Sequence, residues 1–297
     1  MKLLRLHTVL AAIDYDDASH AVLDAGRALA TAGGAELHVV HVDQPRVMAG
    51  SAAKTGEETS VNAAVDLLER ARVRVDRGHV HVIPGEPAPV MRDLAERLGA
   101  DVIVLGPHRE DGANASHLGG TALAVATTST APCLIVTRGL QLPLRRVLVP
   151  IDLSDTARGA LVMALAWSSA LRGGPRSAPT GATQLTAMFV DRAEGAGSAT
   201  TSAKHALAAE LDRVRRDAGS WAGVDIHGLT VASADVARSI ADRAHDADVD
   251  LIVLGTRGLG LDGGERLGSV SANVSRRVDA PVLLVPPAVW ARLGSVP

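Results

Sequence analysis

The chain has 297 residues, of which 47% are hydrophobic and 21% are charged, and its formal net charge is −3. These values are typical of a folded globular protein long enough for two domains, and they exclude a disordered chain. The weak negative charge and an aromatic content of 2% argue against nucleic acid as a partner. The single cysteine, Cys133, excludes an intramolecular disulfide and a multi-cysteine metal site.

In the first half, short apolar runs alternate with segments of helical pattern. Strands are predicted at Thr8–Asp14, Glu36–Asp43, His79–Pro84, Val102–Gly106 and Cys133–Thr137. Helices are predicted at Ala18–Ala32, Glu58–Arg74, Pro89–Leu98 and Gly120–Thr128, the first with Asp17 as its N-cap residue. Apolar strands that alternate with helices predict a parallel sheet covered by helices on both faces.

The second half repeats the first in the same order. Four pairs of segments match: Val9–Asp17 with Val147–Asp155, His38–Asp43 with Thr186–Asp191, Ala100–Gly106 with Val249–Gly255, and Ala131–Val136 with Ala280–Val285. The chain is therefore predicted to be a duplication, with one domain at residues 1–140 and another at 145–290. By the same match, Asp155 is the predicted N-cap residue of the first helix of the second half.

Neither a signal peptide nor a membrane-spanning segment is predicted. The longest nearly apolar run, Gly159–Leu171, is too short to cross a bilayer and suits a helix in the core. Arg5 and His7 interrupt the apolar N-terminus, and no small-residue cleavage site follows. We therefore expect a cytoplasmic protein without a membrane partner.

A glycine-rich stretch follows the predicted strand Asp250–Gly255. Gly258 comes three residues after Gly255, Gly268 ten residues later, and then Ser269-Val270-Ser271 opens a predicted helix that ends at Val278. Glycines allow backbone N–H groups to approach an anion, and the start of a helix adds N–H donors and a favourable dipole. The stretch therefore predicts a phosphate-binding loop; the alternative is a strand-to-helix turn that binds nothing.

The spacing Gly255-x2-Gly258-x9-Gly268-Ser269 resembles the nucleotide-binding signature of the universal stress protein family, and both halves resemble its domain. The resemblance implies two tandem Rossmann-like αβα domains of the adenine nucleotide α-hydrolase-like kind, each with a five-stranded parallel sheet in the order 3-2-1-4-5. It also implies ATP or another adenine nucleotide as the ligand. Mg²⁺ is the usual companion of bound phosphates. The apolar fifth strands suggest that the halves pair as an internal pseudo-dimer, and two chains could associate further as a homodimer.

The resemblance assigns nucleotide contacts to ten residues of the second half. They are Pro150, Ile151, Asp152, Phe189, Gly255, Gly258, Gly268, Ser269, Val270 and Ser271. Asp152 and its two neighbours would lie near the adenine and ribose, Phe189 would stack on the base or crowd it, and the glycines and serines would surround the ribose and phosphates.

The corresponding residues of the first half are weaker candidates. They are Asp14, His41, Gly106, Gly119, Gly120 and Thr121. Arg109 stands where the second half has Gly258, and Gly120 stands where it has Ser269. The arginine can block the approach of a phosphate or pair with it, and the glycine removes a hydroxyl donor. We therefore expect nucleotide to bind mainly in the second half.

No catalytic residue or metal site is predicted. The chain lacks a P-loop and a nucleophile elbow, and no general base stands near the glycine loop. His79 and His81 could share a metal, but no third ligand is apparent.

The leading hypothesis is a stress-response sensor or regulator that binds ATP. A scaffold independent of nucleotide and a slow ATPase or adenylylating enzyme are the alternatives.

Overall fold

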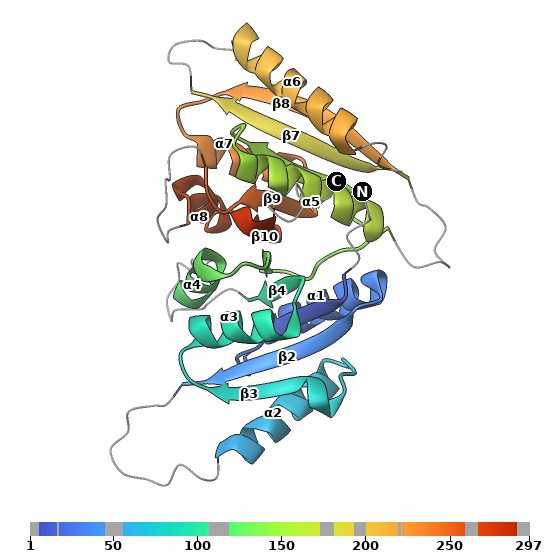
Figure 1. Ribbon diagram of the computed structural model, residues 1–297, viewed down its shortest axis with the longest axis vertical. Helices are drawn as coiled ribbons and strands as arrows, with labels where there is room; N and C mark the ends of the chain where they lie inside the picture. The colour runs from blue at the N-terminus through green and yellow to red at the C-terminus, as the bar shows by residue number, and fades with distance from the viewer. Residues whose placement is uncertain are drawn as a thin grey trace.

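Ten strands of the described residues form one continuous sheet (Figure 1). The structure is a computed structural model, and it describes residues 6–16, 18–44, 56–106, 119–172, 181–192, 200–218, 221, 223–258 and 267–289. The strands of the first half are β1 (Thr8–Ala12), β2 (Glu36–Asp43), β3 (Val80–Pro84), β4 (Val102–Leu105) and β5 (Cys133–Ile135). Those of the second are β6 (Arg146–Ile151), β7 (Thr183–Asp191), β8 (Val224–Ala232), β9 (Leu251–Gly255) and β10 (Val282–Val285).

The order of the strands is β3-β2-β1-β4-β5-β10-β9-β6-β7-β8. Each half therefore has the predicted order 3-2-1-4-5, and all pairs within a half are parallel. The halves meet where β5 and β10 pair in antiparallel fashion, with Leu134 opposite Leu283. This pairing hydrogen-bonds two apolar strands that would otherwise be exposed sheet edges.

Eight α-helices of the described residues cover the two faces of the sheet (Figure 1). One layer contains α1 (Ala18–Gly33), α2 (Gly56–Arg70), α5 (Asp155–Ala170) and α6 (Thr201–Ala218). The other contains α3 (Pro87–Leu98), α4 (Gly120–Thr128), α7 (Val236–Asp246) and α8 (Ser269–Ser275). Successive strand residues point to opposite faces, so Val9 and Ala11 pack under the first layer while Leu10 packs under the second.

The start of α5 corrects one prediction. Ser154, and not Asp155, is the N-cap residue, because its side chain accepts a hydrogen bond from the N–H of Ala157. Asp155 is the first helical residue. Both residue types favour the cap position. The helix therefore begins one residue earlier than predicted, directly after Leu153, which has a φ of +67°.

Several predicted ends differ by a few residues. The helix α2 ends at Arg70 and α8 at Ser275, both short of the predicted ends, whereas α3 begins two residues earlier, at Pro87. His79 belongs to a 3₁₀ turn, η1 (Arg77–His79), that precedes β3.

The apolar run Gly159–Leu171 forms most of the buried helix α5, as predicted. Asp17, the other predicted N-cap residue, lies outside the described residues. In the part of the chain that is described, no helix is long and apolar enough to cross a bilayer.

Candidate functional site

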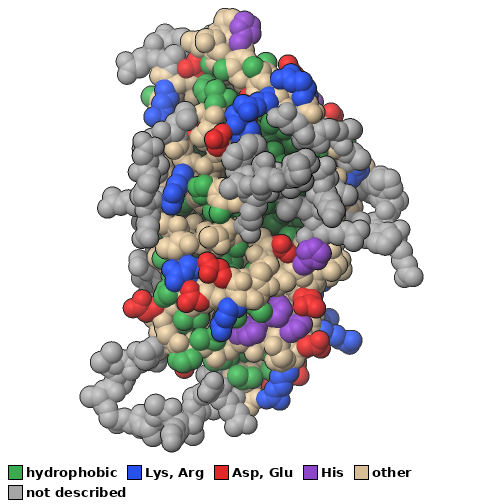
Figure 2. Space-filling model, viewed as in Figure 1, with side chains coloured by type: hydrophobic (Ala, Val, Ile, Leu, Met, Phe, Trp, Pro, Cys, Tyr) green, Lys and Arg blue, Asp and Glu red, His purple; other side chains and the backbone are tan. Residues whose placement is uncertain are grey.

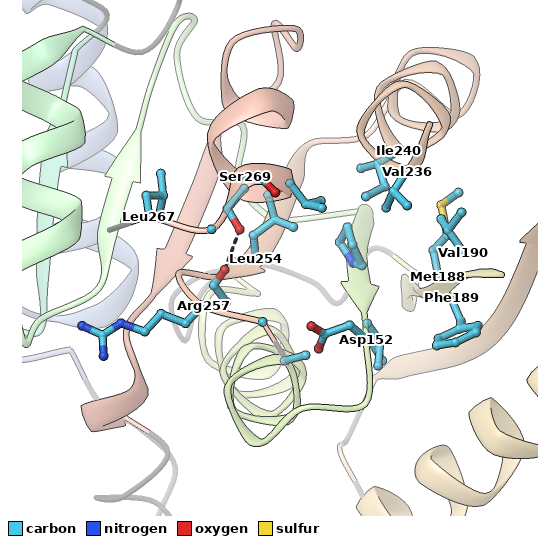
Figure 3. Close-up of a pocket in the computed structure, with 18 of the residues that line it drawn as sticks. Asp152, Met188, Phe189, Val190, Val236, Ile240, Leu254, Arg257, Leu267 and Ser269 are labelled. Carbon is cyan, nitrogen blue, oxygen red and sulfur yellow. Dashed lines mark hydrogen bonds between the residues drawn. The ribbon is translucent and has the colours of Figure 1, made fainter. Parts of the chain in front are cut away.

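A cavity of about 710 Å³ opens at the carboxyl ends of β6, β7 and β9 (Figure 3). The sheet order places β6 between β7 and β9, so the crossovers on its two sides run in opposite directions. Ligands of open parallel sheets bind at such a reversal. All ten second-half residues that the sequence proposed line this cavity. Asp152 follows β6, Phe189 lies on β7, and the glycines and serines lie between the end of β9 and the first turn of α8.

Asp152 and Gly258 approach each other at the floor of the cavity. A Cβ atom built on Gly258 would lie 2.5 Å from Oδ2 of Asp152, so a side chain at this position would displace the carboxylate. The other oxygen, Oδ1, accepts hydrogen bonds from the N–H and the hydroxyl of Ser154 at 3.0 and 2.6 Å. The N-cap residue of α5 therefore fixes the orientation of the carboxylate.

Gly268 and Ser271 hold the start of α8 against the end of β9. The N–H of Gly268 donates to the carbonyl of Thr256 at 2.8 Å. The hydroxyl of Ser271 donates to the carbonyl of Gly255 at 2.7 Å, the dashed contact in Figure 3. This hydroxyl is therefore used within the protein. The first N–H bonded inside the helix is that of Ala272, so the three N–H groups of residues 269–271 have no intrahelical acceptor.

Gly255 has a structural role that the sequence did not reveal. A Cβ atom on this residue would lie 2.8 Å from Cγ2 of Thr156 and 3.1 Å from its backbone carbonyl carbon. The glycine thus allows the end of β9 to pack against the first turn of α5. It places the loop correctly because it brings two elements together.

The apolar wall of the cavity contains residues that the sequence analysis missed. They are Met188, Val190, Val236, Ile240 and Leu254, with Ala157 and Leu267 nearby. Val236 and Ile240 are four residues apart on α7 and so share one face of that helix. The alternation of β7 places Met188 and Val190 on the α7 side of the sheet, whereas Phe189 packs against the α5 layer (Figure 3). The alternation of β7 and the four-residue spacing in α7 could have assigned these residues to one face of each element, but not to a common cavity.

Two arginines and one carboxylate are the charged side chains among the described lining residues. They are Arg192, Arg257 and Asp152, and they give the lining of the cavity a net positive charge. Arg257 extends away from the centre of the cavity in Figure 3. Arg266, the other arginine of the glycine loop, lies outside the described residues.

The first half places its candidates at the corresponding edge, the carboxyl ends of β1, β2 and β4. Asp14 follows β1, Gly106 follows β4, Gly119 is the N-cap residue of α4, and Gly120 and Thr121 are its first two residues. His41, the counterpart of Phe189, donates from Nδ1 to the carbonyl of Ile13 at 2.9 Å. Its ring contacts Tyr15, with the ring centroids 4.1 Å apart. Arg109 lies outside the described residues.

The sheet order and the two helical layers define a doubly wound α/β protein with two similar halves. Residues 5–137 and 143–286 each match the model of the universal stress protein family. The chain belongs to the universal stress protein family.

Individual relatives agree with this assignment. Over 138 residues, 43% of this chain, it is 30% identical to universal stress protein A homolog 1 of Coxiella burnetii, of which the match covers 94%. A universal stress protein from Archaeoglobus fulgidus DSM 4304 has a similar structure, with a TM-score of 0.69 at 21% identity over 94% of this chain and 96% of that one. A putative universal stress protein from Pseudomonas aeruginosa UCBPP-PA14 gives 0.66 at 12% identity, over 97% and 96%. These two structures share the fold.

Proposed function

We propose that the second half binds an adenine nucleotide, ATP, in the cavity at the ends of β6, β7 and β9. The protein would act as a sensor or regulator of the stress response that changes its conformation or partners when ATP is bound. One observation carries the proposal. Ten residues to which the family resemblance assigns nucleotide contact, from four separate segments, line a single cavity.

The size and lining of the cavity suit a nucleotide. Its volume of about 710 Å³ lies within the usual range for small-molecule sites. An apolar wall that includes Met188, Val236 and Ile240 can hold a planar base. The opposite side, with Gly258, Gly268 and Ser269, is polar and mostly backbone. A base at one end and phosphates at the other match these two environments.

The polar side suggests how the phosphates would be held. The N–H groups of residues 269–271 and the exposed hydroxyl of Ser269 are donors without an intrahelical role. The hydroxyl of Ser271 already donates to the carbonyl of Gly255, so Ser271 would contribute its backbone N–H. Asp152 lies where the hydroxyls of a ribose could donate to Oδ2. Mg²⁺ would be held mainly by the phosphates, with Asp152 as the carboxylate within the described lining.

Calorimetric titration of the nucleotide-stripped protein with Mg-ATP tests this proposal. We expect one site per chain. Gly268→Val places methyl groups beside the carbonyl of Thr256, where the phosphate loop closes, and should abolish binding. Gly119→Val changes the N-cap residue of α4, the counterpart in the first half, and should leave binding intact.

The melting temperature of both variants without ligand shows whether each is folded, and its rise with ATP gives a second measure of binding. Two sites per chain would contradict the assignment to the second half. No binding by the folded parent protein would overturn the proposed function and favour a scaffold.

A further inference from the structure

We propose that the first half carries a site for a divalent transition-metal ion of the zinc class, formed by Glu36, His38 and His79. One ligand atom from each of these residues lies within 4.8 Å of those from the other two. Among the described residues this is the one group of three or more such side chains with that spacing. Imidazole nitrogen with one carboxylate oxygen is a donor set that suits zinc and its neighbours copper, nickel and cobalt.

The sheet register creates the cluster. Val40 of β2 lies opposite His81 of β3, and His38 and His79 each stand two residues earlier in the chain, which places them on the same face. Glu36 lies two residues before His38 and shares that face. The three side chains therefore converge at the amino ends of β2 and β3. The nucleotide cavity lies at the carboxyl ends of strands in the other half, so the two sites are independent.

The distances are close to those that a bound ion would require. Oε2 of Glu36 lies 3.7 Å from Nε2 of His38. Zinc bonds nitrogen and oxygen at roughly 2.0–2.2 Å, so two ligands of a tetrahedral ion lie about 3.4 Å apart. The rings of His38 and His79 are stacked with their centroids 4.1 Å apart. The lone pair of a ring nitrogen lies in the plane of the ring, so the His79 ring must rotate out of this stack before all three atoms can bind one ion. A fourth position would remain for water.

His81 supplies the supporting contact that metal-binding histidines usually have. Its Nε2 lies 3.0 Å from Nδ1 of His38. With Nε2 of His38 on the metal, Nδ1–H donates to His81, which fixes the tautomer and the orientation of the ring.

The site is open to solvent on one side. Glu36 is exposed and His79 is partly buried, whereas His38 is buried at the back of the cluster. Figure 2 shows a group of histidine side chains in the lower half of this face, next to acidic and arginine side chains. An ion from solution can thus reach the ligands without any rearrangement of the backbone.

The second half shows what the same positions look like without the cluster. The repeat places Gln184 and Thr186 where the first half has Glu36 and His38. His227 and Leu229 correspond to His79 and His81, because Met188 faces Leu229 as Val40 faces His81. His227 alone remains there, and it serves as a matched control.

Titration of the untagged, metal-stripped full chain with Co²⁺, followed by visible absorption, tests the proposal. We expect one equivalent to bind with the intense d–d bands of a four-coordinate ion, and Zn²⁺ to displace it. Glu36→Gln changes an exposed side chain and should weaken binding at least tenfold without unfolding the protein. His38→Gln should abolish the bands, and His81→Phe, which removes only the supporting hydrogen bond, should weaken binding about 10- to 100-fold.

The control variant His227→Gln should bind cobalt as the parent protein does. Binding that survives both Glu36→Gln and His38→Gln would overturn the proposal, as would a parent protein that shows no saturable cobalt bands. The titration needs no nucleotide, so its result is separate from that of the ATP experiment.

Discussion

The two halves share strand order, helical layers and register, but the sites proposed in them lie at opposite ends of the strands. The second half has its cavity at the carboxyl ends of β6, β7 and β9. The first half has its histidine cluster at the amino ends of β2 and β3. Core positions such as Val9 and Val147 match between the halves and are fully buried or nearly so. The two halves thus share one framework of buried strands, and the residues at the strand ends differ between them.

The helical layers differ as well. In α2 the buried face is formed by Ala64, Leu67 and Leu68, whereas in α6 the same pattern reads Leu207, Glu210 and Leu211. Glu210 pairs with Arg158 of α5 through two hydrogen bonds, and only 8% and 9% of these residues is exposed. The second half thus joins its helices by a buried ion pair where the first has a leucine.

Breaking this ion pair should give the largest effect. Arg158→Met leaves the Glu210 carboxylate buried without its main partner, and it should lower the free energy of unfolding by about 3–5 kcal/mol. The double variant Arg158→Met with Glu210→Leu imitates the apolar packing of the first half and should recover most of the loss. Urea unfolding of the three proteins measures both values. A single variant as stable as the parent would show that the pair contributes little.

Gly255→Ala should have the next largest effect, a loss of about 1–3 kcal/mol in the free energy of unfolding. Its Cβ atom would lie 3.1 and 3.2 Å from backbone atoms of Thr156, so β9 and α5 must move apart. Thermal unfolding without ligand measures the loss. If Gly255 served only to admit phosphate, this variant would keep its stability and lose ATP binding alone.

Asp152→Ala and Asp14→Ala compare the two halves at equivalent strand ends. We expect Asp152→Ala to weaken Mg-ATP binding about tenfold, or about 1.4 kcal/mol, because a hydrogen-bond acceptor in the cavity is lost. Asp14→Ala should leave the affinity unchanged. Calorimetry gives both constants, and melting curves without ligand show whether the variants are folded. Equal effects of the two substitutions would contradict the assignment of the site to the second half.

The sequence predicted the frame and the polar part of the site because both depend on local patterns. The alternation of strands and helices predicted the parallel sheet, and the glycines after the strand end predicted the loop that lies beside Asp152. Met188 and Ile240 could not be placed from spacing alone, because they meet only through the crossover from β8 to α7. The partners of His79 were missed for a similar reason. His38 lies 41 residues earlier, and only the register of β2 and β3 brings the two rings together.

The smallest expected effect concerns Gly120, which stands where the second half has Ser269. A Cβ atom on Gly120 would meet nothing within 4 Å, so Gly120→Ser is sterically free. Serine has the higher helix propensity, and the free energy of unfolding should rise by up to about 0.5 kcal/mol. The new hydroxyl restores one donor but leaves Arg109 and the contact between Tyr15 and His41 unchanged. Calorimetry should therefore still give one ATP per chain. A second site in this variant would mean that one hydroxyl, and not the whole strand edge, separates the two halves.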